Sequence, residues 1–246
     1  MTFLFRWIGR RKGTIFLGFA ALAIASIFRH EPPSASPLDC STITEEADRA
    51  VLPAIANLST EPVPLRVNGV RYAIPGNYFR YPAIGCDTEE DGMLLRATYP
   101  GLQGATEETR EWFDSGLNRQ TLQILVKRQK NSTKLEGFLS QFEYMHGPPD
   151  LTETITEEFG MTHVRRTADR VYRKNDGDAF YRTDENGAIT DFIRCKRRRT
   201  GEISTCKIIV LLDHAQVQIT FFPENLPQWE TIQQAVLGLL ESFRVQ

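Results

Sequence analysis

The spacing of apolar side chains predicts β-strands in the first half of this 246-residue chain. Residues 65–75, 92–100 and 119–129 form short runs rich in β-branched and aromatic side chains, with Gly, Pro or Asn in and around them. Within the first run, Asn68 and Gly69 form a pair that is typical of a two-residue hairpin turn. We therefore expect antiparallel strands from residue 65 onward.

A different spacing, with apolar residues three or four apart, predicts helices. It is strongest over 132–146, where a Gly-Pro-Pro sequence follows, and over 225–243, where one apolar face runs the length of the segment. A shorter helix is predicted over 41–56. Residues 106–116 are expected to be a loop with a helical turn, in which aromatic residues cap the core.

Residues 162–222 show turn sequences about every ten residues, and the connections between them are too short for parallel crossovers. They predict an antiparallel meander, in which the consecutive apolar residues of 207–212 form a central strand. The order is therefore sheet, helix, longer sheet, helix. We interpret it as an α+β fold, a two-layer sandwich whose helices cover one face of an antiparallel sheet, after an N-terminal transmembrane helix.

The most continuous apolar run, residues 14–28, predicts a segment that meets a membrane. Residues 5–13 before it carry four basic residues and no acidic one, a flank that tends to stay in the cytoplasm. As a helix the run is about 22 Å long, which is short for a bilayer core of roughly 30 Å. Two interpretations remain open, an uncleaved single-span anchor and a cleaved signal peptide.

This topology predicts three parts: residues 1–29 as basic flank and anchor or signal, 30–40 as a linker, and 41–246 as an exported α+β domain. The domain would lie in the periplasm, held at the inner membrane or released after cleavage. Lipid attachment at Cys40 is not expected, because the residues before it are not small. The exported part carries 24 basic and 31 acidic residues, and this net charge of −7 argues against nucleic acid as a partner.

All four cysteines fall in the exported part, and an oxidising compartment would pair them. Cys195 and Cys206 flank a turn centred on Thr200 and Gly201, which would set them opposite each other as a disulfide. A strict two-residue turn would place the pair at a hydrogen-bonded position, where the wider spacing suits the bridge less well. By elimination, Cys40 would pair with Cys86.

The leading candidate binding surface is a basic run at the same hairpin, Arg194, Lys196, Arg197, Arg198 and Arg199. Five cations within six positions suit anionic headgroups, an acidic protein partner or a polyanion. The competing interpretation is a solvated hairpin tip that pairs with nearby acids.

A second candidate surface is aromatic and consists of Tyr78, Phe79 and Tyr81. Aromatic residues at a strand end suit protein contacts. Core packing is the competing interpretation for these residues.

Motifs for catalysis or metal binding are not found in the sequence. The histidines stand singly at 30, 146, 163 and 214, and there is no nucleophile elbow, HExxH, Walker loop or GxGxxG. The acidic residues 87–91 lack the spacing and glycine of a calcium loop. We therefore expect no cofactor, no metal and no catalytic residue.

The strand that ends in Ile74-Pro75 and the closing sequence QITFFPENLPQWETIQQAVLGLLESFRV resemble the Mog1/PsbP-like sandwich family over residues 67–245. The resemblance implies an α+β sandwich whose members mostly bind other molecules and share no catalytic residues. YAIPGNY (72–78) followed by ATYPGL (97–102) is similar to uncharacterised proteobacterial envelope proteins, some of them similar to immunity proteins of type VI secretion toxins.

These observations favour a membrane-anchored periplasmic domain that binds a protein partner in the bacterial envelope without catalysis, such as an immunity protein against a periplasm-delivered toxin. One alternative is a structural accessory of an envelope or secretion complex. Another is an enzyme on an envelope lipid or cell-wall component, with a site assembled only by folding.

Overall fold

The computed structural model describes residues 58–79, 88–114, 117–129, 134–146, 154–166, 177–197 and 202–245. All of them belong to one compact unit, residues 38–246. The predicted membrane segment 14–28, the predicted helix 41–56 and the predicted Cys40–Cys86 bridge lie outside the described residues. Within the described ranges, no helix is long and apolar enough to cross a membrane.

The described chain is mostly β-structure. Its strands are β1 (Pro62–Val67), β2 (Val70–Pro75), β3 (Thr88–Glu90), β4 (Gly92–Thr98), β5 (Thr121–Arg128), β6 (Thr154–Glu158), β7 (Met161–Arg166), β8 (Gly177–Thr183), β9 (Ile189–Arg197), β10 (Ile203–Leu211) and β11 (Ala215–Phe221). The helices are α1 (Arg110–Asp114), α2 (Leu135–His146) and α3 (Trp229–Ser242), with 3-10 turns η1 (Gly76–Tyr78) and η3 (Pro223–Gln228).

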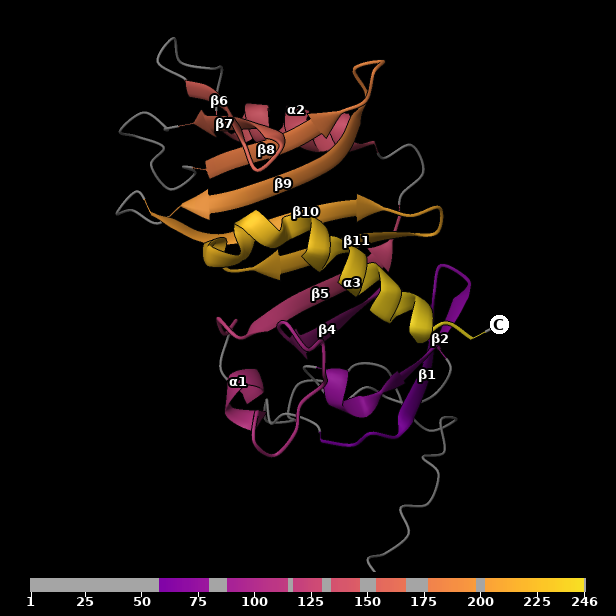
Figure 1. Ribbon diagram of the computed structural model, residues 1–246. Helices are drawn as coiled ribbons and strands as arrows, with labels where there is room; N and C mark the ends of the chain where they lie inside the picture. Colours follow the sequence, from indigo (N-terminus) through magenta and orange to yellow (C-terminus); the bar gives the residue numbers. More distant parts are fainter. Residues whose placement is uncertain are drawn as a thin grey trace, which may run out of the picture. The chain divides into compact units, whose positions relative to one another are not determined.

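Two sheets organise these strands (Figure 1). The larger is an eight-stranded antiparallel sheet in the order β4-β5-β11-β10-β9-β8-β7-β6. The smaller has the order β2-β1-β3, with β1 antiparallel to β2 and parallel to β3. The β1–β2 hairpin turns at Asn68 and Gly69, whose φ values of 49° and 80° confirm the predicted turn.

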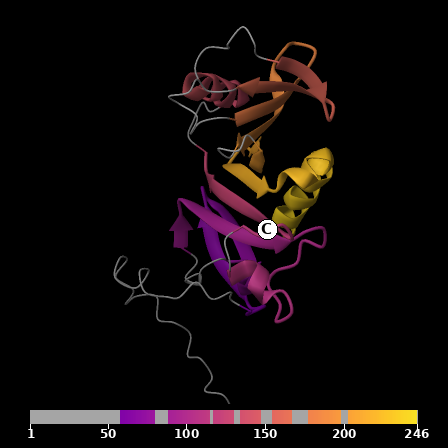
Figure 2. The ribbon, with the colours of Figure 1, turned by 90° about the vertical axis from the view of Figure 1, so that its left-hand side faces the viewer.

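The predicted fold class was wrong. The chain is not a two-layer sandwich with its helices on one face: it is mostly β-structure, and α2 and α3 lie on opposite sides of the large sheet (Figure 2). The reason lies in the central strands, where neighbouring apolar residues point to opposite faces. Because both faces are apolar there, each needs a cover.

Strand alternation divides the core in two. Ile193 and Ile208 are buried in the cluster that contains the apolar residues of α3. Their neighbours Phe192 and Ile209 are buried in the cluster that contains Leu135 of α2. We call these two sides of the large sheet the α3 face and the α2 face.

The α3 face is closed by α3 together with the small sheet. Val67 and Ile74 of the small sheet share one apolar cluster with α3 and with the inner strands. Backbone hydrogen bonds join the residues after α3 to strand β2 of the small sheet. Ala73 N donates to Phe243 O at 2.8 Å, and Val245 N donates to Arg71 O at 3.0 Å.

The α2 face is covered only in part. Leu135 and Phe142 of α2 pack over residues of β7 to β10, such as Phe192 and Ile209. Toward β5 and β11 the same face carries the polar side chains of residues such as Gln123 and Gln218. The uncovered polar part of this face forms the site described below.

The two motifs of the fainter resemblance meet in space. Ala105 N donates to Asn77 O at 2.8 Å, Asn77 Nδ2 donates to Ala105 O at 3.0 Å, and the Tyr78 hydroxyl donates to Leu102 O at 2.9 Å. A Cβ at Gly104 would come within 2.5 Å of the Asn77 side chain, so only glycine fits beside it. These motifs therefore have a structural role.

A cationic cleft as the candidate functional site

A cleft of about 500 Å³ opens on the α2 face between α2 and the strands β5, β11, β10 and β9. We call it the cationic cleft. Its lining residues are Gln123, Lys127, Phe138, Gln141, Phe192, Arg194, Lys196, Thr205, Lys207, Ile209, Gln218 and Thr220. Four of these side chains are cationic and none is a carboxylate.

The sheet register brings the cations together. Lys207 of β10 lies directly opposite Arg194 of β9 on one side and Thr220 of β11 on the other, and Thr205 lies opposite Lys196. Lys127 comes from β5, two strands away from β10. Strand alternation points all four cationic side chains to the same face, where they line one cleft.

The charges in the cleft are not neutralised by the described part of the chain, where no ion pair involves Lys127, Arg194, Lys196 or Lys207. Burial lowers the pKa of Lys207 below its ordinary value, and the charges of Arg194 and Lys127 lower it further. Burial also lowers the pKa of Arg194. An anion in the cleft would relieve this unfavourable arrangement.

Polar groups accompany the charges. The Lys207 ammonium donates to Gln218 Oε1 at 2.9 Å, which fixes its direction on the sheet. Gln141 of α2 lines the opposite wall and is exposed. The arrangement suits a ligand with several carboxylate oxygens, because ammonium, guanidinium and amide groups all donate to such oxygens.

The predicted disulfide lies directly behind the cleft and is confirmed. Cys195 and Cys206 face each other on β9 and β10, with Cα atoms 4.0 Å apart and both side chains buried. The turn is not the strict two-residue one, since β9 ends at Arg197, β10 begins at Ile203 and the register shifts near Ile203. The bridge holds the strand pair that carries three of the four cations.

Arg197 belongs to the same predicted basic run but lies on the α3 face. Its guanidinium holds Asp178 through two contacts, Nε to Oδ2 at 2.6 Å and NH2 to Oδ1 at 2.7 Å. Asp178 is fully buried and also bonds His163 Nε2 at 2.8 Å. Arg197 therefore contributes to a buried ion-pair network across β7, β8 and β9.

His163 is the centre of that network. Its Nδ1 lies 3.2 Å from Glu158 Oε1, and its ring stacks on Phe180. Burial alone would lower the pKa of His163, but the hydrogen bonds and charges of Asp178 and Glu158 outweigh it, so the pKa is raised. For Asp178, burial is likewise outweighed by His163 and Arg197, and its pKa is lowered. His163 is not among the residues that line the cationic cleft.

The remaining predicted site residues have other surroundings. Tyr78 is half-buried, with its ring centroid 5.0 Å from that of Phe243, and Phe79 is buried in the core. Arg198, Arg199 and Tyr81 lie outside the described residues. The candidate surface that the structure assembles therefore combines Arg194 and Lys196 with two lysines that the sequence did not single out, Lys127 and Lys207.

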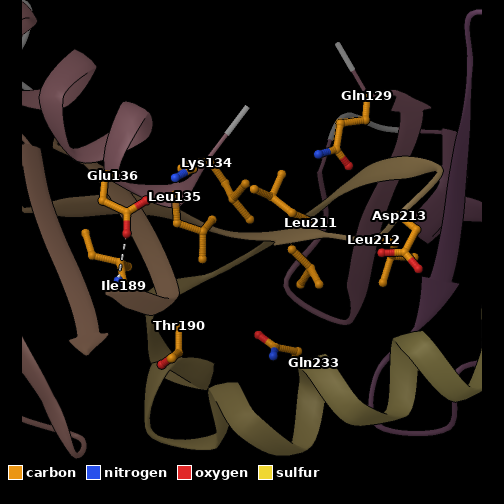
Figure 3. Close-up of a pocket in the computed structure, with 12 residues that line it drawn as sticks. Gln129, Lys134, Leu135, Glu136, Ile189, Thr190, Leu211, Leu212, Asp213 and Gln233 are labelled. Carbon is orange, nitrogen blue, oxygen red and sulfur yellow. Dashed lines mark hydrogen bonds between the residues drawn. The ribbon is translucent and has the colours of Figure 1, made fainter. Parts of the chain in front are cut away.

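A second cavity of about 530 Å³ lies where β10 ends and β9 begins (Figure 3). Its charged residues are of both signs, with Lys134 near Glu136 and Asp213 on another side. Glu136 is already engaged, because its Oε1 accepts from Ile189 N at 3.0 Å. In the described ranges, no group of three or more metal-binding side chains is found. Of the two cavities, the cationic cleft is the one whose charged lining residues all have the same sign.

No protein-family model matches this chain, and no curated protein matches its sequence. Two solved structures are similar to this chain. One is Smlt3025, an immunity protein of the Stenotrophomonas maltophilia type IV secretion system, with a TM-score of 0.53 and 15% identity over 76% of this chain and 95% of that one. The other is the iron-regulated outer membrane lipoprotein FrpD of Neisseria meningitidis, with a TM-score of 0.48 and 17% identity over 78% and 97%.

At this level of identity the match to Smlt3025 shows a shared fold. The faint resemblance to immunity proteins is supported in that sense, although the secretion system named there is type IV and not type VI. Smlt3025 is described as an immunity protein and not as a Mog1/PsbP-like protein, so the resemblance to the Mog1/PsbP-like family is not supported.

Proposed function

We propose that this chain is a non-enzymatic protein-binding protein of the immunity type, and that its cationic cleft receives an acidic segment of the partner. The observation that carries the proposal is the set of four cationic side chains that line one cleft without a carboxylate among them. The fold shared with a secretion-system immunity protein supports the same class of function.

The electrostatics of the domain favour an acidic partner at this cleft over a basic one. The chain as a whole has a slightly negative net charge, whereas the cleft, with four cations, is locally positive. Such a patch accelerates encounter with an oppositely charged surface and suppresses wrong partners. A half-buried, partly desolvated lysine such as Lys207 gains more from a carboxylate than an exposed one does.

The compartment belongs to the proposal as well. A disulfide between Cys195 and Cys206 is typical of proteins outside the reducing cytoplasm. We therefore propose that the domain lies in an exported compartment, where a delivered toxin would meet it. A structural accessory of a secretion complex would use the same cleft for a permanent partner.

The cleft can be tested with a defined probe. Fluorescein-labelled deca-glutamate is titrated with the protein, and binding is followed by anisotropy at low and high salt. The triple variant Lys127→Gln/Arg194→Gln/Lys207→Gln is expected to bind at least ~10-fold more weakly, because it removes three of the four positive charges in the cleft. A tenfold change in affinity corresponds to about 1.4 kcal/mol of binding free energy. Binding by the unchanged protein is expected to weaken as salt screens the charges.

The matched control removes three cations elsewhere. Arg66→Gln/Arg119→Gln/Lys134→Gln has the same net charge as the cleft variant, and all three positions are exposed. It is expected to bind the probe like the unchanged protein. Equal loss in both variants would show that net charge and not the cleft attracts the probe, and would contradict the proposal.

A further inference from the structure

The strand β6 forms one end of the large sheet, and among the described strands it pairs with β7 alone (Figure 1). A strand at a sheet edge presents backbone groups that another extended segment can bind. Natural edges are often covered or shortened, yet Ile155 in β6 is 64% exposed. This edge lies at the opposite end of the sheet from β4 and β5.

The hairpin geometry predicts which backbone groups face outward. β6 and β7 are joined by the two residues Phe159 and Gly160, so Glu158 and Met161 close the turn as a hydrogen-bonded pair. Pairs alternate along an antiparallel ladder, which makes Thr156 and His163 the next hydrogen-bonded pair. The N–H and C=O groups of Ile155 and Glu157 therefore point away from β7.

The side chains at those two positions share one face. Ile155 and Glu157 are two residues apart in a strand, so both point to the α2 face, and both are exposed. One is a large apolar side chain and the other an acid. An incoming strand that places an apolar residue and a basic residue two positions apart would match them in both polarity and charge.

The turn at the end of this edge is strained. Phe159 has a φ of 55° and Gly160 a φ of 70°, and a left-handed conformation is rare for a bulky aromatic residue. The Phe159 carbonyl accepts from the indole N–H of Trp229 at 3.1 Å, and the Phe159 ring centroid lies 6.1 Å from that of Phe180, while the residue as a whole is 42% exposed. Asparagine or glycine would suit this turn better, and strained residues of this kind gather at functional sites.

We propose that the β6 edge is a second docking surface, which binds an extended segment of a protein partner by strand addition. The segment carries a basic residue beside Glu157 and an apolar residue beside Ile155, and its end reaches the partly exposed Phe159. Backbone hydrogen bonds provide the affinity, and the alternating side chains provide the specificity. The surface is separate from the cationic cleft and does not depend on it.

The probe is the fluorescein-labelled heptapeptide TVTKTVT, in which valine and lysine alternate on one face of a strand. The matched control peptide TVTETVT has glutamate in place of lysine. The unchanged protein is expected to bind the lysine peptide at least ~10-fold more tightly in anisotropy titrations. The cleft variant Lys127→Gln/Arg194→Gln/Lys207→Gln is expected to bind it equally well, which separates this surface from the proposed function of the cleft.

Three variants locate the contact. Ile155→Pro removes an outward N–H without a partner in β7, which an edge strand tolerates, and it is expected to abolish peptide binding while the melting temperature stays within a few degrees. Glu157→Lys is expected to reverse the preference between the two peptides. Phe159→Asn relieves the turn and removes the ring, so it is expected to weaken binding several-fold in a protein that stays folded.

Three results would overturn the proposal. If Glu157→Lys leaves the peptide preference unchanged, or Ile155→Pro leaves binding intact, the probe binds elsewhere. If light scattering shows a dimer of the unchanged protein that Ile155→Pro dissolves, the edge pairs with a second copy of this chain and not with a partner.

Discussion

Arginine side chains have opposite electrostatic surroundings on the two faces of the large sheet. Arg197 lies on the α3 face, where two oxygens of buried Asp178 hold its guanidinium. Arg194, three positions earlier in the same strand, lies on the α2 face among other cations and faces no carboxylate in the cationic cleft. The difference follows from strand alternation alone, which sends odd and even positions to opposite faces.

This comparison shows that a run of basic residues in a sequence is not one functional unit. Arg197, one member of the predicted run, forms an ion pair that stabilises the fold. Two other members, Arg194 and Lys196, line the cationic cleft together with Lys127 and Lys207, where no carboxylate balances their charge. A charge without a partner in the folded protein contributes little to stability and is available for binding. The following predictions test that division, beginning with the largest expected effect.

The largest loss of stability is expected when the buried carboxylate of Asp178 is removed. Asp178→Ala leaves Arg197 and His163 buried without their shared anion, and breaking such a pair typically costs about 3–5 kcal/mol. Urea denaturation should show this loss in the free energy of unfolding. If the free energy of unfolding changed by less than ~0.5 kcal/mol, the usual range for surface substitutions, the ion-pair network would not stabilise the α3 face.

Removal of the disulfide comes next. A bridge that closes a loop of this size is expected to contribute about 3 kcal/mol. The double variant Cys195→Ala/Cys206→Ala should therefore unfold at lower urea concentration than the oxidised protein. A reductant should lower the midpoint of the unchanged protein and leave that of the variant unaltered; an equal response of both would assign the effect to other cysteines.

The pH dependence of stability is expected to be smaller and to come from His163. Its pKa is raised in the folded protein, so the stabilisation is complete below the unfolded pKa of about 6.5 and is lost as pH rises through the folded pKa. A tenfold difference in proton affinity between the folded and unfolded states corresponds to about 1.4 kcal/mol. In His163→Gln, the free energy of unfolding should no longer fall as the pH is raised through this range. If it still falls, another titrating group is responsible.

Asp178 titrates in the opposite direction and in a different range. Because its pKa is lowered, its contribution is present above about pH 4 and is lost as pH falls through the folded pKa. Acid unfolding of His163→Gln should therefore retain a loss at low pH.

The cleft cations are expected to have the smallest effect on stability. Arg194→Gln/Lys207→Gln relieves mutual repulsion and should leave the free energy of unfolding within ~0.5 kcal/mol of its original value, or slightly raise it. Arg197→Gln is the control on the opposite face and should destabilise the protein clearly. If the two variants behaved alike, the division between the faces would fail.

Much of the local structure could be predicted from the sequence. The Asn68-Gly69 hairpin, the apolar helices α2 and α3, the antiparallel meander and the Cys195–Cys206 bridge all follow short-range rules of spacing and turn chemistry. Strand β6 was missed, because its alternating polar residues give a weak signal at a sheet edge.

The arrangement of the helices and the cleft could not be predicted in this way. The consecutive apolar residues of β10 are typical of a strand buried on both faces, but that pattern does not say which helix covers which face. Lys127 and Lys207 look ordinary in isolation, and they share a cleft only because β5 pairs with β11 and β11 with β10. Such pairing between distant segments sets the register, and no local pattern reveals it.

The central claim, that the α2 face binds the partner, can be tested by site-specific photocrosslinking in the cells that make this protein. Gln141 on α2 lines the cationic cleft, and Gln234 on α3 is an exposed glutamine on the opposite face. A photoreactive residue at Gln141 is expected to capture one acidic protein, and the capture should be lost when Lys127, Arg194 and Lys207 are changed to glutamine. Capture of the same protein from Gln234 alone, or from Gln141 regardless of those cations, would contradict the account.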